Sequence, residues 1–209
     1  MSIWAKVFSE RYDGAIAQLA KLIEACPDEH WSSPVWRVHR TDRHVWPIVR
    51  GMGADLPDDE RLQLQAAFWN VAVHALHALD VYLDGGLNPA APPQPFDTWQ
   101  MPGHILPEEP PSRQQLLDYV ASMRTKAHRV LDHLTDADVA RPARRGRPFG
   151  DLLVHELVHL AEHNAQLEEF LNARAGWSHP SWRTDDRWFG GCEHCGPEER
   201  DRVSGQPNT

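Results

Sequence analysis

Four long stretches of helical periodicity constrain the fold of this chain more than any other feature of its sequence. Apolar residues recur at three- and four-residue steps over about residues 3–25, 58–84, 112–135 and 150–175. Alternating apolar runs, and paired strands around an Asn-Gly or Asp-Gly turn, are not evident between them. Amphipathic helices of this length bury their apolar faces most simply against one another. We therefore predict an all-α protein built as a four-helix bundle.

Signals at the ends of these segments support the prediction. Gly85 and Gly86 end the second segment, and Gly176 stands where a C-cap glycine closes the fourth. The third begins at Ser112, whose hydroxyl can cap the helix while Gln115 completes a capping box. We expect one bundle domain over residues 1–176 and a tail over 177–209 that is partly packed or disordered.

The connections between the segments are unusually long. Residues 27–57 contain several tryptophans and histidines, and residues 84–111 are rich in proline. Connections of this length usually have a function or lack order. We expect substrate specificity to depend on them.

Net charge and composition exclude several classes of partner. The chain carries a formal charge of -9, which disfavours nucleic acid and anionic lipid. No apolar run approaches the length of a membrane span, and charged residues interrupt the first segment where a secretory signal would be apolar. Three cysteines are too few for a disulfide framework. These features indicate a cytoplasmic protein with neither a membrane nor a nucleic acid among its partners.

Histidines on the fourth segment suggest a metal site. His155, His159 and His163 are spaced four residues apart and form a row along one helix face. A metal ion can take two neighbours in this row, but His155 and His163 would lie about 12 Å apart along the axis and cannot share one ion. A third ligand must come from another helix, and the second segment offers His74 and His77.

The same stretch satisfies the zinc-peptidase motif. His155-Glu156-x-x-His159 matches HExxH, in which Glu156 would act as general base. The longer metzincin pattern fails because Glu162 and Ala165 stand at its glycine and third-histidine positions. A zinc peptidase is therefore the weakest of the functions considered.

Two stretches together resemble the DinB/YfiT-like family. They are "FWNVAVHALHALDVYLDG" in the second segment and "HLAEHNAQLEEFL" in the fourth. The resemblance extends from the second segment through the fourth, and its specific positions are Trp69, His74, Asp80, Tyr82, His159, His163, Gln166 and Leu167.

The resemblance implies a ligand set and an assembly. It implies a four-helix bundle, usually a homodimer, with a divalent metal such as Zn, Ni or Fe held by His74, His159 and His163. The residues left as neighbours of the site are His77, His155 and Glu156. Val158 departs from the family, because many relatives carry arginine before the first histidine of the pair.

The resemblance also implies a chemistry. Characterised relatives include transferases and isomerases that use low-molecular-weight thiols such as mycothiol or bacillithiol. We therefore expect a metal-dependent thiol S-transferase or a hydrolase acting on a small-molecule substrate. A non-catalytic metal-binding stress-response protein is the alternative.

A second group of potential ligands lies in the tail. Cys192, His194 and Cys195 form a lone C-x-x-C with an intervening histidine, and no second pair accompanies it. The motif is compatible with a tail that binds no metal, with an accessory metal site or with a redox role.

Overall fold

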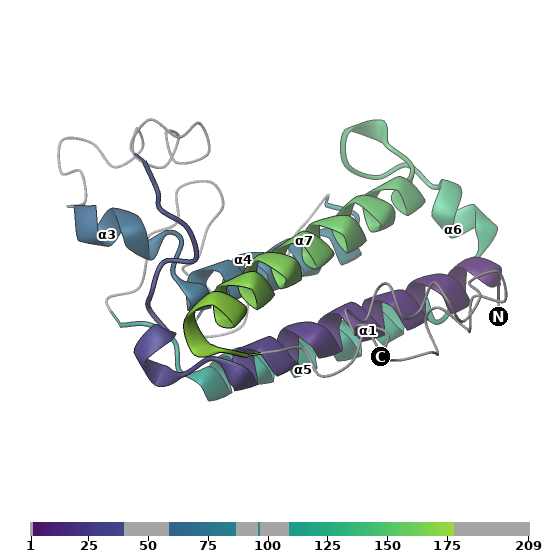
Figure 1. The fold of residues 1–209 in the computed structure, drawn as a ribbon. Helices are drawn as coiled ribbons and strands as arrows, with labels where there is room; N and C mark the ends of the chain where they lie inside the picture. Colours follow the sequence, from purple (N-terminus) through teal and green to yellow (C-terminus); the bar gives the residue numbers. More distant parts are fainter. Residues whose placement is uncertain (1, 40–58, 87–95, 97–108, 178–209) are drawn as a thin grey trace, which may run out of the picture. The chain divides into compact units, whose positions relative to one another are not determined.

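The regular structure of this chain is helical. The computed structural model describes residues 2–39, 59–86, 96 and 109–177, and within these ranges the β contacts are two isolated bridges. The long helices are α1 (Ile3–Ala25), α4 (Phe68–Leu83), α5 (Arg113–Leu131) and α7 (Phe149–Ala175), and the short ones are α3 (Asp59–Leu64) and α6 (Asp136–Ala140) (Figure 1). The predicted all-α class is confirmed.

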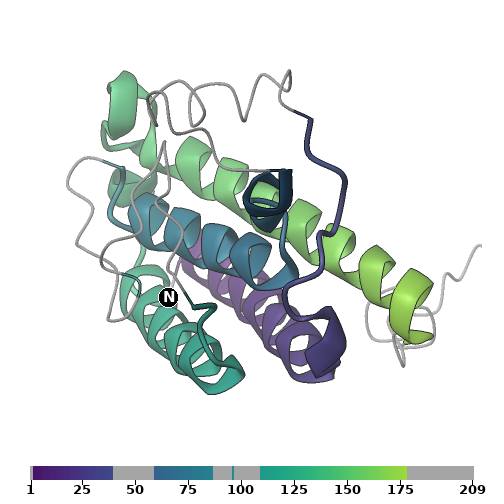
Figure 2. The same cartoon turned by 90° about the vertical axis from the view of Figure 1, so that its left-hand side faces the viewer.

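The four long helices form a bundle in which α1 and α4 occupy opposite corners. Helix α1 packs against α5 and α7, and α4 packs against the same two helices (Figure 2). Helices α4 and α7 run antiparallel, whereas α4 and α5 run parallel (Figure 1). Because α4 and α5 are parallel, α4 finishes at the end of the bundle opposite to the start of α5 (Figure 1). Most of the proline-rich stretch that joins the two helices, residues 87–95 and 97–108, lies outside the described residues.

Apolar side chains from all four long helices pack together to form the hydrophobic core. The largest buried side chains include Tyr12, Ile16 and Leu19 of α1, Leu76 and Leu79 of α4, Leu116 and Tyr119 of α5, and Phe149 of α7. The hydroxyl of the buried Tyr12 donates to the Leu153 carbonyl oxygen at 2.6 Å. The bond ties α1 to the helix that carries the histidine row.

The helix ends follow the sequence signals. The Ser112 hydroxyl accepts from the Gln115 amide at 3.3 Å, and the Gln115 side chain accepts from the Ser112 amide at 2.8 Å, so the capping box is present. Gly176 ends α7 in the left-handed conformation, with φ of 60°. Both termini were predicted from the residue types alone.

The prediction of one continuous helix over residues 58–84 is wrong, because the structure has two helices there, α3 and α4. The chain breaks between α3 and α4, where Ala67 adopts an extended backbone. The Ala66 carbonyl accepts from the Val35 amide at 2.7 Å, and the Phe68 amide donates to the Ser33 carbonyl at 3.1 Å. These bonds to an earlier segment replace the intrahelical bonds, so tertiary pairing overrides the helix propensity of the two alanines.

Helix α4 is also less amphipathic than predicted. Most of its side chains are buried, with His74 and Tyr82 half-buried. A helix that is apolar on nearly all sides must be covered on nearly all sides. The side chain of His74 is therefore only partly exposed to solvent.

Two other predictions concern the whole chain. None of the helices in the described ranges is both long enough and apolar enough to cross a membrane. The predicted tail, apart from Trp177, lies outside the described residues, and so do Cys192, His194 and Cys195.

Candidate metal centre

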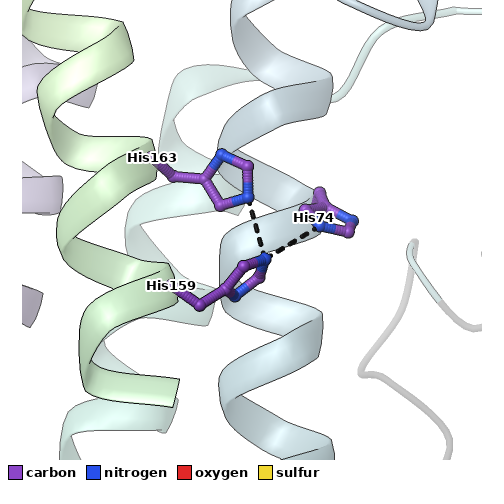
Figure 3. A group of neighbouring side chains, drawn as sticks. All are labelled: His74, His159 and His163. Atoms are coloured by element: carbon purple, nitrogen blue, oxygen red, sulfur yellow. Dashed lines mark hydrogen bonds between the residues drawn. The ribbon is translucent and has the colours of Figure 1, made fainter. Parts of the chain in front are cut away.

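Three histidines from two neighbouring helices meet at one point of the bundle. His159 and His163 lie one turn apart on α7, and His74 projects toward them from α4 (Figure 3). All three side chains are half-buried. The antiparallel packing of α4 against α7 therefore brings together residues that are 85 positions apart in the chain.

The ring nitrogens are spaced as ligands of one ion would be. Nε2 of His159 lies 3.2 Å from Nε2 of His74 and 2.9 Å from Nε2 of His163, and the ligand atoms all fall within 4.8 Å of one another. Nitrogens bound at 2.0–2.1 Å to a tetrahedral ion would lie about 3.4 Å apart. The three imidazoles therefore fit a divalent metal ion with little change in position.

A hydrogen bond holds the Nδ1 edge of the His163 ring, the edge opposite to the Nε2 that faces His159. Its Nδ1 lies 2.9 Å from Oε1 of Gln166, three residues along α7. Since an amide oxygen only accepts, this contact places the proton of a neutral His163 on Nδ1 and leaves a lone pair on Nε2. Burial and the nearby His159 lower the pKa of His163 to about 4. The ring is therefore neutral near pH 7, as a metal ligand must be.

The far side of His159 faces a buried carboxylate. Nδ1 of His159 lies 3.3 Å from Oε2 of Glu156, whose side chain has no exposed surface. Burial raises the pKa of Glu156, and the contact with His159 partly opposes that rise. The carboxylate lies on the core side of the ring, away from the other two histidines.

The other predicted neighbours lie outside the group. His155 is exposed, and its ring packs edge-on against Tyr82 with centroids 5.5 Å apart. His77 is buried on α4, and burial lowers its pKa. The sequence offers two overlapping pairs of histidines, His155 with His159 and His159 with His163. In the structure the second pair lies beside His74. His155 stacks on His159 with ring centroids 6.4 Å apart but is not in the group of three, and Glu156, the general base of the peptidase motif, is buried in the core.

A pocket of about 410 Å³ begins one side chain away from the histidines. Gln166, which bonds His163, also lines the pocket. The other lining residues come from the next two turns of α7 and from the segment after α1, namely Val35, Trp36, Glu169, Phe170, Ala173 and Arg174. Its volume is in the range that holds a small organic molecule.

Comparison with known proteins places this bundle in a family. The model of the DinB superfamily matches residues 11–167. The chain belongs to the DinB superfamily. The matched region contains α1, α4, α5 and the part of α7 that carries the histidine pair. Comparisons with curated proteins and with solved structures gave no significant match.

The sequence predicts no role for some residues of this DinB site. Gln166 is one of the positions that resemble the family, and its spacing of three from His163 is the spacing at which side chains on one helix face meet. Trp36 and Val35 belong to a long connection without a periodic pattern. Their position beside α7 could not be predicted from the sequence.

Proposed function

We propose that this DinB protein is a metal-dependent enzyme acting on a small molecule, as a thiol S-transferase or a hydrolase. The observation that carries the proposal is the convergence of three Nε2 atoms, from His74, His159 and His163, at distances that suit one divalent ion. Metal binding is also a property of the DinB family. Zinc, nickel and iron all accept imidazole ligands.

The chain's own residues prepare the site for catalysis. Gln166 fixes the His163 tautomer, and three neutral imidazoles leave the ion's full charge available to a fourth ligand. When bound, a divalent ion with an open position lowers the pKa of water or of a thiol and stabilises the resulting anion. A low-molecular-weight thiol and its electrophile would occupy the side of the group that is not covered by α4 and α7.

Two features favour an enzyme over a non-catalytic metal-binding stress protein. Structural metal sites are usually closed by four protein ligands, whereas this group has three among the described residues. The pocket that Gln166 lines offers space for an organic substrate one side chain away from His163. A protein that only binds metal needs neither feature.

Metal content tests the ligand set. We expect purified wild-type protein to hold about one equivalent of Zn²⁺, and His163→Ala to lose it, because two imidazoles bind far more weakly than three. His155→Ala is the matched control, since His155 lies one turn from His159 on the exposed face of the same helix. Equal metal content in all three proteins would show that the proposed ligands are wrong.

Turnover tests the chemistry. The zinc-loaded protein is given a panel of thiols with monochlorobimane, and separately a set of ester and amide substrates. Metal-dependent product formation that is lost in His163→Ala and kept in His155→Ala is the expected result. Tight zinc binding without turnover of any thiol or ester would favour the non-catalytic protein.

A further inference from the structure

Glu156 is a buried carboxylate whose position has no explanation in the packing of the bundle. Its side chain is 0% exposed, and among the described residues neither carboxylate oxygen has a hydrogen bond. A carboxylate in apolar surroundings is destabilising unless a proton or a nearby positive charge compensates it. A leucine at this position would suit the core better. Glu156 therefore requires a compensating group.

The nearest polar group is the ring of His159. Oε2 of Glu156 lies 3.3 Å from Nδ1 of His159, and this nitrogen is also buried without a hydrogen bond among the described residues. Tyr12 approaches Glu156 from α1, but its hydroxyl donates to the Leu153 carbonyl oxygen. Each of the two unsatisfied groups thus has the other within reach.

We propose that Glu156 is a positioning residue that accepts the Nδ1 proton of His159 and so directs the Nε2 lone pair of that ring at the metal. The inference rests on the proposed metal site. His159 is the central ring of the group, since its Nε2 is the one within 3.2 Å of both other Nε2 atoms (Figure 3). A carboxylate behind this ring fixes both its tautomer and its orientation.

Charge explains why the carboxylate is placed in the core. Three neutral imidazoles contribute no negative charge to a divalent ion, whereas Glu156 contributes one at the distance of a single ring. In a low-dielectric interior that attraction is strong. The buried carboxylate is therefore unfavourable in the metal-free protein and becomes compensated when the ion binds. Glu156 reduces the stability of the empty protein and increases its affinity for metal.

Two substitutions and one control separate this role from a packing role. Glu156→Gln keeps an oxygen acceptor without the charge, and Glu156→Leu removes both. Glu162→Gln makes the same charge change at an exposed position one residue before His163. Zn²⁺ and Co²⁺ affinities are measured by competition with a chelator, together with the Co²⁺ absorption spectrum and the melting temperature of the metal-free protein.

The expected order of affinity is opposite to the expected order of stability. Glu162→Gln binds as the wild type does, Glu156→Gln binds more weakly, and Glu156→Leu binds most weakly, with losses of about 10- to 100-fold. The metal-free Glu156→Leu protein melts at a higher temperature than the wild type. A folded Glu156→Leu variant that binds zinc as tightly as the wild type would overturn the proposal.

Failure of the metal site itself gives a different result. If wild-type binding is unaffected by His163→Ala, the proposed ligand set is wrong. If binding needs His163 but ignores Glu156, only the inference about Glu156 is wrong.

A measurement on the wild type covers the case in which neither Glu156 variant folds. Long-range ¹H–¹⁵N spectra of the zinc-loaded protein report the tautomer of each histidine. We expect His159 to carry its proton on Nδ1. Zinc bound through Nδ1 of His159 would contradict the proposal.

Discussion

At the scale of single residues, the site depends on what lies behind each imidazole. His163 has an amide oxygen of Gln166 at 2.9 Å behind its ring, and His159 has the carboxylate of Glu156 at 3.3 Å. An acceptor at Nδ1 holds the ring proton there and leaves the Nε2 lone pair free to bind a metal ion. The rings face one another through their Nε2 atoms. Each acceptor lies three residues from its histidine on α7, a spacing that brings two side chains onto one helix face.

The low pKa of His163 predicts acid sensitivity of the metal-free protein. Its folded-state pKa is lowered to about 4 from an ordinary 6.5, so between these values the unfolded chain binds a proton that the folded chain does not. The contribution to stability is complete above pH 6.5 and is lost as the pH falls toward 4. We expect a loss of about 1–3 kcal/mol in the free energy of unfolding from this residue.

Urea unfolding in the presence of a chelator, at pH 7.5 and pH 4.5, measures this effect. His163→Gln removes the titrating group and should lose less stability over this range than the wild type. His155→Gln makes the same substitution at the exposed histidine one turn before His159 and is the matched control. Identical pH dependence in all three proteins would mean that His163 does not titrate as the structure indicates.

At the scale of elements, the start of α7 is fixed by close packing against α6. Gly150 is the second residue of α7, and a Cβ added there would lie 2.4 Å from Cγ1 of Val139 in α6. It would also lie 3.3 Å from the Val139 carbonyl oxygen, which is backbone and cannot rotate away. The glycine allows α6 to cross the beginning of the helix that carries the histidine pair.

Gly150→Ala is expected to destabilise the protein by about 1–3 kcal/mol, because overpacking forces the two helices apart. Gly14→Ala is the matched control. Gly14 lies exposed in the middle of α1 with nothing within 4 Å of its added Cβ, so alanine there should stabilise by up to about 1 kcal/mol. Thermal unfolding of both variants gives the comparison. Equal shifts in melting temperature would contradict the packing argument.

At the scale of the whole molecule, the parallel helices α4 and α5 are joined by a buried ion pair. Lys126 of α5 donates to the Asp80 carboxylate, to the Asp80 carbonyl oxygen at 2.9 Å and to Asp84 at 2.7 Å. Lys126 and Asp80 are 9% and 5% exposed. Two parallel neighbouring helices cannot be joined by a short turn, so a turn does not fix their relative position along the bundle axis. The bonds from Lys126 to Asp80 and Asp84 hold α4 and α5 at one relative position.

Lys126→Met is expected to cost about 3–5 kcal/mol, because it leaves the Asp80 carboxylate buried without its partner. Lys126→Met combined with Asp80→Leu should recover most of that loss. Arg124→Met breaks the exposed pair of Arg124 with Asp13 and should cost less than about 1 kcal/mol. Chemical unfolding of the four proteins tests the prediction, and a double variant no more stable than Lys126→Met would refute it.

The sequence by itself determined the elements of this protein and part of its site. Periodic apolar residues, the Ser112 capping box and Gly176 predict helix positions because these signals act within one or two helical turns. The same local geometry indicates that His159 and His163 can share an ion and that His155 and His163 cannot. The third histidine, His74, came from the family resemblance, since residues alone left His77 equally open.

Only the tertiary structure decided features that depend on distant segments. The break before α4 arises because residues 33–35 bond Ala66 and Phe68, and nothing local in the alanines signals it. Lys126 interrupts an apolar face of α5, but its partner Asp80 is set by the parallel packing of α4. Glu156 lies in a motif whose usual reading is catalytic, and its burial against His159 follows from the rotation of α7 in the bundle. Periodicity fixes which residues share a helix face, whereas the packing of helices decides what that face meets.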